Sequence, residues 1–161
     1  MERNKIKLLI MDVDGTLTDG TINIGNNGEL FKAFSVKDGH GIRRILPTLG
    51  IAPVIITGRN SDIVKYRAKE IGVEYLFQGS DDKVNILGAL LQQLGLTFDN
   101  CAYIGDDLND YECMIKCRIK GCPHDAVKEI KAISDYVTER NGGQGAVREF
   151  IEYLASICQA K

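Results

Sequence analysis

The sequence has no long apolar segment. No stretch approaches the roughly 18 consecutive apolar residues that make a candidate membrane helix. Residues 1–5 lead into the first apolar run without the hydrophobic core of a signal peptide. Low-complexity segments, internal repeats and linker-like changes in composition are absent as well. We therefore expect no membrane partner, a cytoplasmic location and a single domain spanning residues 1–161.

An excess of charge of one sign is also missing. The 20 basic and 22 acidic residues are mixed along the chain and give a formal charge of -2. Such a balance creates no positive field that would attract nucleic acid or an anionic membrane. We therefore expect no nucleic-acid partner and a small molecule as the ligand.

No paired C-x-x-C motif occurs among the five cysteines, whose number is odd. Cys113, Cys117 and Cys122 lie near His124, which is the grouping that could suggest zinc. However, two cysteines four residues apart on a helix are ordinary small apolar residues. We expect reduced thiols rather than a zinc site or disulfides.

What the sequence does contain is an alternation of short apolar runs and helical patterns. Residues 6–11 form a continuous apolar run that ends at Asp12, as expected for a central parallel strand buried on both faces. Further strands are predicted at 53–56, 75–77, 101–104, 118–121 and 136–137. Helices are predicted at 42–46, 62–71, 84–94, 108–117, 126–133 and 145–157. Pro47 should end or kink the first of them near Leu46, and Ser61 can cap the second. This order predicts an α/β fold with a doubly wound parallel sheet.

One segment departs from that alternation. Residues 21–24 and 30–34 flank the turn sequence Gly25-Asn26-Asn27-Gly28. Asn and Gly tolerate positive φ, so this pattern predicts a β-hairpin. The hairpin follows the first strand, and we expect it to form a flap above the end of that strand.

Polar residues gather where the predicted strands end. The first strand runs into Asp12-Val13-Asp14-Gly15-Thr16, the second into Thr57-Gly58-Arg59 and the fourth into Gly105-Asp106-Asp107-Leu108-Asn109-Asp110, while Lys83 opens the helix after the third. Each motif alone is typical of a turn, a strand exit or a helix cap. In an open parallel sheet, however, ligands bind outside these carboxyl ends. The ordered set therefore predicts one shared site.

The crowded carboxylates predict a divalent cation, because oxygen ligands around a hard cation relieve their repulsion. Mg²⁺ is usually held by one or two carboxylates together with the phosphate of a substrate. Asp12, Asp106 and a backbone carbonyl near Asp14 would suffice. We expect Asp107 and Asp110 to lie behind these ligands and to orient them.

Groups that suit a phosphate occur at the same place. Lys83 offers a point charge, Thr57 offers a hydroxyl, and the backbone N–H groups around Gly15 can form an anion-binding nest. Asp12 is the expected nucleophile, which would form an aspartyl-phosphate. Asp14, two residues later on the turn, can protonate the leaving oxygen and then activate water. The sequence therefore predicts a magnesium-dependent phosphohydrolase.

This ordered set resembles the motifs of the haloacid dehalogenase superfamily of phosphotransferases, over nearly the whole chain. The resemblance implies a Rossmann-like core. It also implies that Asp12 is the nucleophile, that Asp14 is the acid/base and that Thr57 and Lys83 bind phosphate. The magnesium ligands that it implies are Asp12, Asp14 and Asp106.

Four segments are similar to a capless subgroup of that superfamily, which acts on octulosonate phosphates; they are residues 25–29, 32–39, 56–59 and 142–149. The resemblance implies hydrolysis of 3-deoxy-D-manno-octulosonate 8-phosphate, a step of lipopolysaccharide biosynthesis. It also implies a β-hairpin flap without a cap domain, and a homotetramer in which a neighbouring subunit completes the active site.

Arg59 and Arg67 match arginines near the sugar-acid end of the substrate in this subgroup. Gln144 departs from its pattern, because the subgroup often has arginine within this glycine-rich segment. We therefore expect a basic contact to be missing there.

Alternatives remain open on the sequence alone. A nine-carbon ulosonate 9-phosphate of the sialic-acid type would be hydrolysed by the same chemistry, although Arg59 favours the eight-carbon substrate. A non-catalytic oligomerisation module, like domains fused to sugar-acid cytidylyltransferases, has no need for both Asp12 and Asp14. A phosphomutase is disfavoured, because no cap excludes water from the aspartyl-phosphate.

Overall fold

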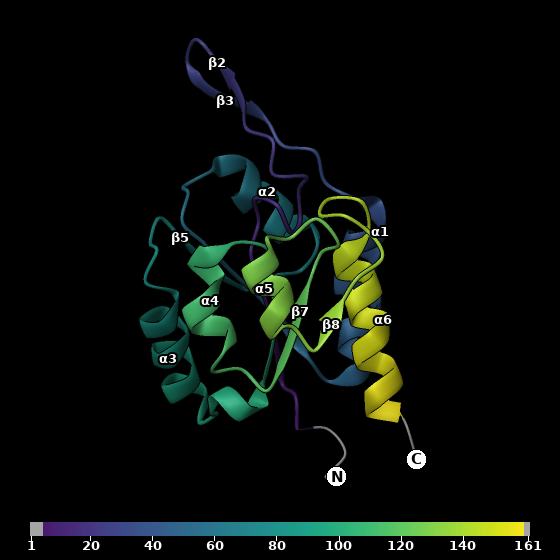
Figure 1. Cartoon of the computed structure of the whole chain (residues 1–161). Helices are drawn as coiled ribbons and strands as arrows, with labels where there is room; N and C mark the ends of the chain where they lie inside the picture. The colour runs from purple at the N-terminus through teal and green to yellow at the C-terminus, as the bar shows by residue number, and fades with distance from the viewer. Residues whose placement is uncertain (1–4, 160–161) are drawn as a thin grey trace.

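A six-stranded parallel sheet forms the centre of the computed structural model, which describes residues 5–159 (Figure 1). Its strands are β1 (Leu8–Met11), β4 (Ala52–Thr57), β5 (Tyr75–Gln78), β6 (Cys101–Ile104), β7 (Ile119–Cys122) and β8 (Tyr136–Val137). They are arranged in the order β5-β4-β1-β6-β7-β8, and every neighbouring pair is parallel. The predicted doubly wound sheet is confirmed.

Strand β1 lies between β4 and β6 and is buried on both faces. Leu9 and Met11 belong to the core on one side of the sheet, whereas Leu8 and Ile10 belong to the core on the other. The chain runs outward from β1 through β4 to β5 and then returns to place β6 on the opposite side of β1. The strand order therefore reverses at β1, the position where open α/β sheets bind ligands.

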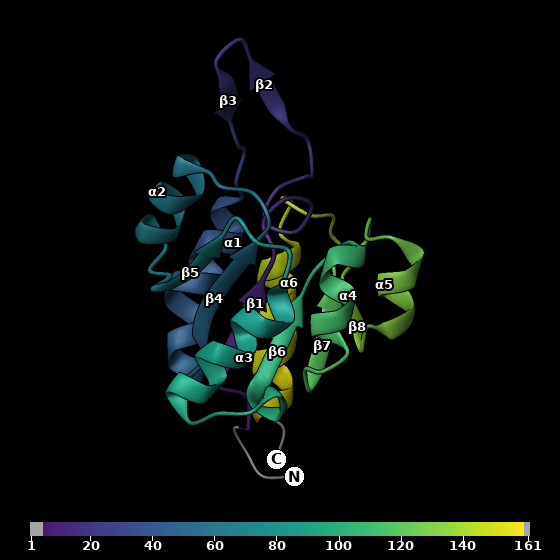
Figure 2. The same ribbon diagram turned by 90° about the vertical axis from the view of Figure 1, so that its left-hand side faces the viewer.

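Helices cover both faces of the sheet, as the two perpendicular views show (Figure 2). Helices α2 (Asp62–Glu70) and α6 (Ala146–Gln159) pack on one face, and α3 (Lys83–Leu94), α4 (Leu108–Met114) and α5 (Lys128–Ile133) pack on the other. Ser61 caps α2 as predicted, since its Oγ accepts from the Val64 N–H. No helix within residues 5–159 is long and apolar enough to cross a membrane.

The segment before β4 begins its helical path earlier than predicted. Helix α1 covers Val36–His40, and the chain continues as a π-helical turn over Gly41–Ile45 and a 3-10 turn over Leu46–Leu49. The Ser35 hydroxyl accepts from two backbone N–H groups of the first turn, which sets the start of α1. Pro47 lies in the tighter 3-10 turn, consistent with the predicted break near Leu46.

The predicted flap is confirmed as the hairpin of β2 (Asn23–Gly25) and β3 (Gly28–Phe31). Its strands pair up to Gly25 and Gly28, so that Asn26 and Asn27 form the tip. Both views show the hairpin projecting away from the sheet and its helices (Figures 1 and 2).

Candidate active site

A cleft of about 490 Å³ opens at the carboxyl ends of β1 and β4. It is lined by Asp12, Asp14, Thr57, Gly58, Arg59, Asp81, Asp107 and Asn109. Most of these residues come from the strand ends singled out in the sequence. The cleft therefore lies where the parallel fold places a ligand site.

Asp12 follows β1 directly, and its backbone N–H donates to the Ile104 carbonyl of β6 at 3.2 Å. Its carboxylate is buried and accepts a 2.8 Å hydrogen bond from Nζ of Lys83, the first residue of α3. Burial lowers the pKa of Lys83, but the carboxylates of Asp110 and Asp12 outweigh it and raise that pKa above its usual value. Lys83 thus stays cationic beside the candidate nucleophile.

Asp110 is fully buried and accepts four hydrogen bonds. Its Oδ1 accepts from Lys83 Nζ at 2.7 Å and from the Tyr103 hydroxyl at 2.7 Å. Its Oδ2 accepts from the backbone N–H groups of Asp106 at 3.1 Å and Asp107 at 3.4 Å. Asp110 therefore holds the lysine and the loop after β6 in place, which suits the orienting role expected of it. Asp107 itself is the N-cap of α4 and lines the cleft.

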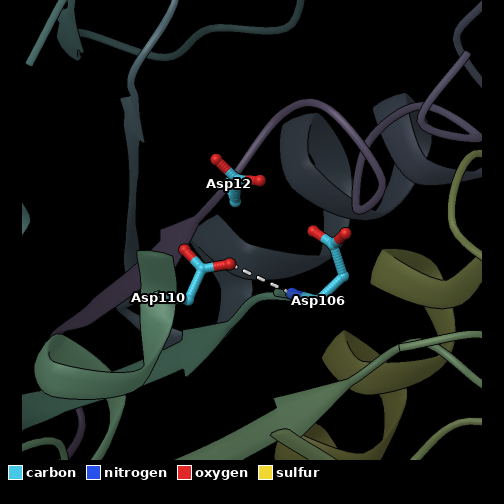
Figure 3. Close-up of side chains that lie close together, drawn as sticks. All are labelled: Asp12, Asp106 and Asp110. Atoms are coloured by element: carbon cyan, nitrogen blue, oxygen red, sulfur yellow. Dashed lines mark hydrogen bonds between the residues drawn. The ribbon is translucent and has the colours of Figure 1, made fainter. Parts of the chain in front are cut away.

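Asp12, Asp106 and Asp110 each place a carboxylate oxygen within 4.8 Å of the others (Figure 3). Burial and the charge of Asp110 raise the pKa of Asp12 to about 6, although Lys83 lowers it. Burial and the charge of Asp12 raise the pKa of Asp106 to about 8, although the Thr16 hydroxyl lowers it. This crowding of oxygens is the arrangement that a divalent cation relieves, so the donor set fits Mg²⁺. Because all four contacts of Asp110 are to the protein, Asp12 and Asp106 are the side chains of this group that suit a metal.

The turn after β1 depends on glycine. Gly15 has a φ of 95°, and a Cβ atom there would lie 2.0 Å from Oδ2 of Asp106. The next residue, Thr16, donates from Oγ1 to Oδ1 of Asp106 at 2.8 Å. The turn that was predicted to hold a phosphate therefore also fixes the carboxylate of Asp106, a candidate metal ligand.

The glycine-rich segment before α6 closes against the same turn. The Gly143 N–H donates to the Thr16 carbonyl at 3.1 Å, and a Cβ atom on Gly142 would lie 2.0 Å from the Gly15 carbonyl oxygen. Only glycine allows this approach of two backbones. Gln144 is exposed.

Asp14 lies on the cleft side of the turn, apart from the group of three carboxylates. Its Oδ1 accepts a 2.5 Å hydrogen bond from Nζ of Lys32, which also lies 2.9 Å from Oε1 of Glu29 on β3. Burial lowers the pKa of Lys32, but its bonds to Asp14 and Glu29 raise that pKa overall. The Asp14 side chain is thus engaged by Lys32, and a metal contact from this residue would come from its backbone carbonyl. That carbonyl is the group predicted from the crowded carboxylates, before the family resemblance was considered.

Thr57 ends β4 and is buried at the floor of the cleft, and Arg59 is exposed at its wall. Arg67 lies elsewhere in this chain. Its guanidinium donates to the Ser35 carbonyl at 3.2 Å and to Glu70 Oε2 at 2.7 Å, and it lines a small cavity beside α1. A contact between Arg67 and a substrate stays a prediction.

Sequence reasoning gave no role to several residues of the site, namely Lys32, Asp81, Tyr103 and Asn109. Lys32 belongs to a segment that carried the family resemblance, but nothing in its spacing showed that it would meet Asp14. Tyr103 lies in an apolar strand, where a hydroxyl gives no periodic signal. Asn109 lies inside the motif of residues 105–110 and Asp81 lies two residues before Lys83, but neither was given a role of its own.

Comparison with known proteins agrees with this geometry. A family model described as haloacid dehalogenase-like hydrolase matches residues 75–151. The 3-deoxy-D-manno-octulosonate 8-phosphate phosphatase of Escherichia coli (strain K12) is 46% identical over 149 residues, which cover 92% of this chain and 79% of that protein. The chain belongs to the haloacid dehalogenase-like hydrolases. The corresponding phosphatase of Yersinia pestis, another relative, is 42% identical over the same shares of the two chains.

Solved structures of haloacid dehalogenase-like hydrolases share the whole fold. The 3-deoxy-D-manno-octulosonate 8-phosphate phosphatase of Moraxella catarrhalis, in complex with magnesium ion, phosphate ion and KDO, has a TM-score of 0.90 at 43% identity, covering 98% of this chain and 89% of that one. The cobalt-bound deoxy-D-mannose-octulosonate 8-phosphate phosphatase of Haemophilus influenzae has a TM-score of 0.91 at 35% identity, covering 99% and 92%. The resemblance inferred from the motifs is therefore confirmed.

Proposed function

We propose that this protein is a magnesium-dependent phosphatase that hydrolyses 3-deoxy-D-manno-octulosonate 8-phosphate to the free sugar acid and phosphate. The observation that carries the proposal is the pairing of a buried Asp12 with Lys83 at the head of a cleft that also holds Asp14, Thr57 and Arg59. Relatives that are 42–46% identical and carry this activity in their names support the choice of substrate.

Asp12 is the proposed nucleophile. One of its carboxylate oxygens attacks phosphorus, the bond between phosphorus and the sugar oxygen breaks, and Asp14 gives its proton to that oxygen. Asp14 then takes a proton from water, whose oxygen attacks the aspartyl-phosphate and releases phosphate, which restores Asp12. Thr57 and Lys83 bind the phosphate, together with backbone N–H groups of the turn around Gly15. The Gly15 N–H donates to Thr18 Oγ1 at 3.2 Å and the Thr16 N–H to the Val13 carbonyl at 3.1 Å, so both must exchange these acceptors for phosphate if they take part.

Asp12 and Asp106 are the side chains that would hold Mg²⁺, with the backbone carbonyl of Asp14. When bound, Mg²⁺ supplies the positive charge that offsets the repulsion between an anionic carboxylate and an anionic phosphate. Asp110 and Asp107 keep these ligands in position through the contacts described above.

We also propose that the enzyme is a homotetramer whose active site is completed by a neighbouring subunit. The flap exposes three large apolar side chains, Ile24 at 67%, Leu30 at 62% and Phe31 at 55%. Apolar residues gathered on a projecting hairpin are typical of a protein interface. Light scattering after gel filtration tests the assembly, and a monomer would contradict it. The cytoplasmic location and the single-domain organisation of residues 1–161 stay predictions.

The function is tested by the release of phosphate from a panel of sugar-acid phosphates, with Mg²⁺ and with excess chelator. We expect the eight-carbon octulosonate 8-phosphate to be turned over fastest and chelator to abolish the activity. Faster turnover of a nine-carbon ulosonate 9-phosphate would assign the alternative substrate. No release from any ester would indicate a non-catalytic oligomerisation module.

A further inference from the structure

A partly buried chain of polar contacts connects the flap to the active-site turn. Lys32 follows β3, and the exposed fraction of its side chain is 2%. Its ammonium bridges Asp14 Oδ1 on the turn after β1 and Glu29 Oε1 in the flap. The other oxygen of Glu29 accepts from the Ser61 hydroxyl at 2.5 Å, and Ser61 is the N-cap of α2. The chain thus runs from the turn through the flap to the helix that follows the Thr57 loop.

This arrangement fixes the direction in which Asp14 presents its carboxylate. A lone aspartate on a turn can rotate about its side-chain bonds, and a partly buried ion pair whose lysine has a second anchor restricts that freedom. Lys32 reaches Asp14 from the flap side of the cleft, whereas Lys83 reaches Asp12 from α3. The two carboxylates therefore have separate cations, so that removal of Lys32 leaves the Lys83–Asp12 pair intact.

We propose that Lys32, held by Glu29, is a positioning residue that orients Asp14 toward the leaving-group oxygen. The proposal rests on the phosphatase function and on the acid/base role of Asp14 given above. It predicts that Lys32 matters most when the leaving group needs a proton. An alkyl phosphate needs one because its alkoxide is a poor leaving group, whereas p-nitrophenolate leaves without help.

The test compares ethyl phosphate with p-nitrophenyl phosphate for the wild-type enzyme and for Lys32→Met. A positioned general acid contributes about 10²- to 10⁴-fold. We therefore expect Lys32→Met to lower kcat for ethyl phosphate at least about tenfold more than kcat for p-nitrophenyl phosphate. Lys32→Arg, which can bridge both carboxylates, should restore most of the difference. An equal loss for both esters, or no loss for either, would overturn the proposal.

Two further variants separate positioning from a general effect on the fold. Lys65→Met removes an exposed lysine whose ion pair with Asp62 is also exposed, and it should change neither ester. In an Asp14→Asn background, Lys32→Met should have no further effect on the ratio of the two esters, because Lys32 acts through Asp14. A further selective loss of ethyl phosphate turnover in that background would overturn the proposal. If circular dichroism shows that Lys32→Met is unfolded, Lys32→Gln takes its place in the same comparison.

Neither ester contains a sugar acid, so this test is independent of the natural substrate. A wild-type enzyme that hydrolyses the two esters but not octulosonate 8-phosphate would contradict the proposed substrate and leave the Lys32 comparison valid. The opposite outcome would contradict only the role of Lys32. In that case the wild-type enzyme hydrolyses octulosonate 8-phosphate, and Lys32→Met has the same ratio of kcat values for the two esters as the wild type.

Discussion

A Cβ atom at Gly15 would lie 2.0 Å from Oδ2 of Asp106. The turn that follows Asp12 and the carboxylate of Asp106 therefore approach each other at a point where only glycine fits. This contact couples the proposed phosphate-binding turn to the loop that carries the proposed metal ligand Asp106.

Gly15→Ala should consequently displace Asp106 and lower kcat about a hundredfold, the scale of a misplacement of about 1 Å in an active site. Gly72→Ala is the matched control, because Gly72 also has positive φ, at 78°, but has nothing within 4 Å of a built Cβ atom. Steady-state kinetics on both variants separate the clash from backbone strain. Equal losses of activity would show that strain alone is responsible.

Asp106 and Asp110 should differ in what their removal costs. Asp110→Ala leaves the buried Lys83 ammonium and the Tyr103 hydroxyl without their shared acceptor, and we expect it to lower the free energy of unfolding by about 3–5 kcal/mol. Asp106→Ala relieves the repulsion between the carboxylates, so in chelator the free energy of unfolding should stay unchanged or rise. Asp106→Ala should nevertheless weaken Mg²⁺ binding more than Asp110→Ala does. Denaturant unfolding in chelator and a magnesium titration measure the two effects. A stable Asp110→Ala protein would contradict the positioning role.

Stability should fall with rising pH because of Asp38. Its side chain is buried, its Oδ2 is without a hydrogen-bond partner among the described residues, and burial raises its pKa from 3.8 to about 6. The folded state binds this proton more tightly than the unfolded chain, so the contribution is complete below pH 3.8 and is lost as the pH rises through 6. The loss is about 3 kcal/mol.

Asp38→Asn isolates this effect from the other carboxylates. The amide keeps an oxygen that can accept from the Arg148 N–H, which lies 2.8 Å from Oδ1 of Asp38. Unfolding free energies between pH 4 and pH 6 should therefore fall less steeply for this variant than for the wild type. Identical slopes would show that Asp38 does not titrate in that window.

Arg59 should recognise the sugar acid rather than the transferred phosphate. It is exposed on the cleft wall, two residues beyond Thr57. A charge-assisted hydrogen bond to a carboxylate contributes about 1.5–3 kcal/mol, so Arg59→Ala should raise KM for octulosonate 8-phosphate about tenfold to a hundredfold. Hydrolysis of p-nitrophenyl phosphate by Arg59→Ala should barely change. The control is Arg44→Ala, which removes an exposed arginine outside the cleft and should leave the hydrolysis of both substrates unchanged. An equal decline for both substrates would place Arg59 at the phosphate.

The sequence was most informative where one physical rule decides the outcome. The apolar run before Asp12, the turn residues around Asn26 and the Ser61 cap each led to the element that the structure contains. The ends of neighbouring parallel strands meet at one edge of the sheet, and for this reason the sequence predicts that Asp12 and Asp106 lie together.

What escaped prediction depends on contacts between distant segments. Lys32 meets Asp14 only because the flap returns over the turn, and no periodic pattern encodes that contact. The contact between Arg67 and the substrate stays a prediction; within this chain its guanidinium donates to the Ser35 carbonyl and lies over the Phe34 ring, and the sequence did not indicate either contact. The direction of a long side chain on a helix depends on such neighbours.

The nucleophilic role of Asp12 is the central claim, and Asp12→Asn tests it most directly. The amide keeps the shape of the side chain and can still accept from Lys83, but it lacks the charge that attacks phosphorus. Phosphate release from octulosonate 8-phosphate should fall at least about a thousandfold with circular dichroism unchanged, whereas Asp62→Asn, at an exposed site on α2, should retain full activity. An Asp12→Asn protein that retained more than about a tenth of wild-type turnover would contradict the covalent mechanism.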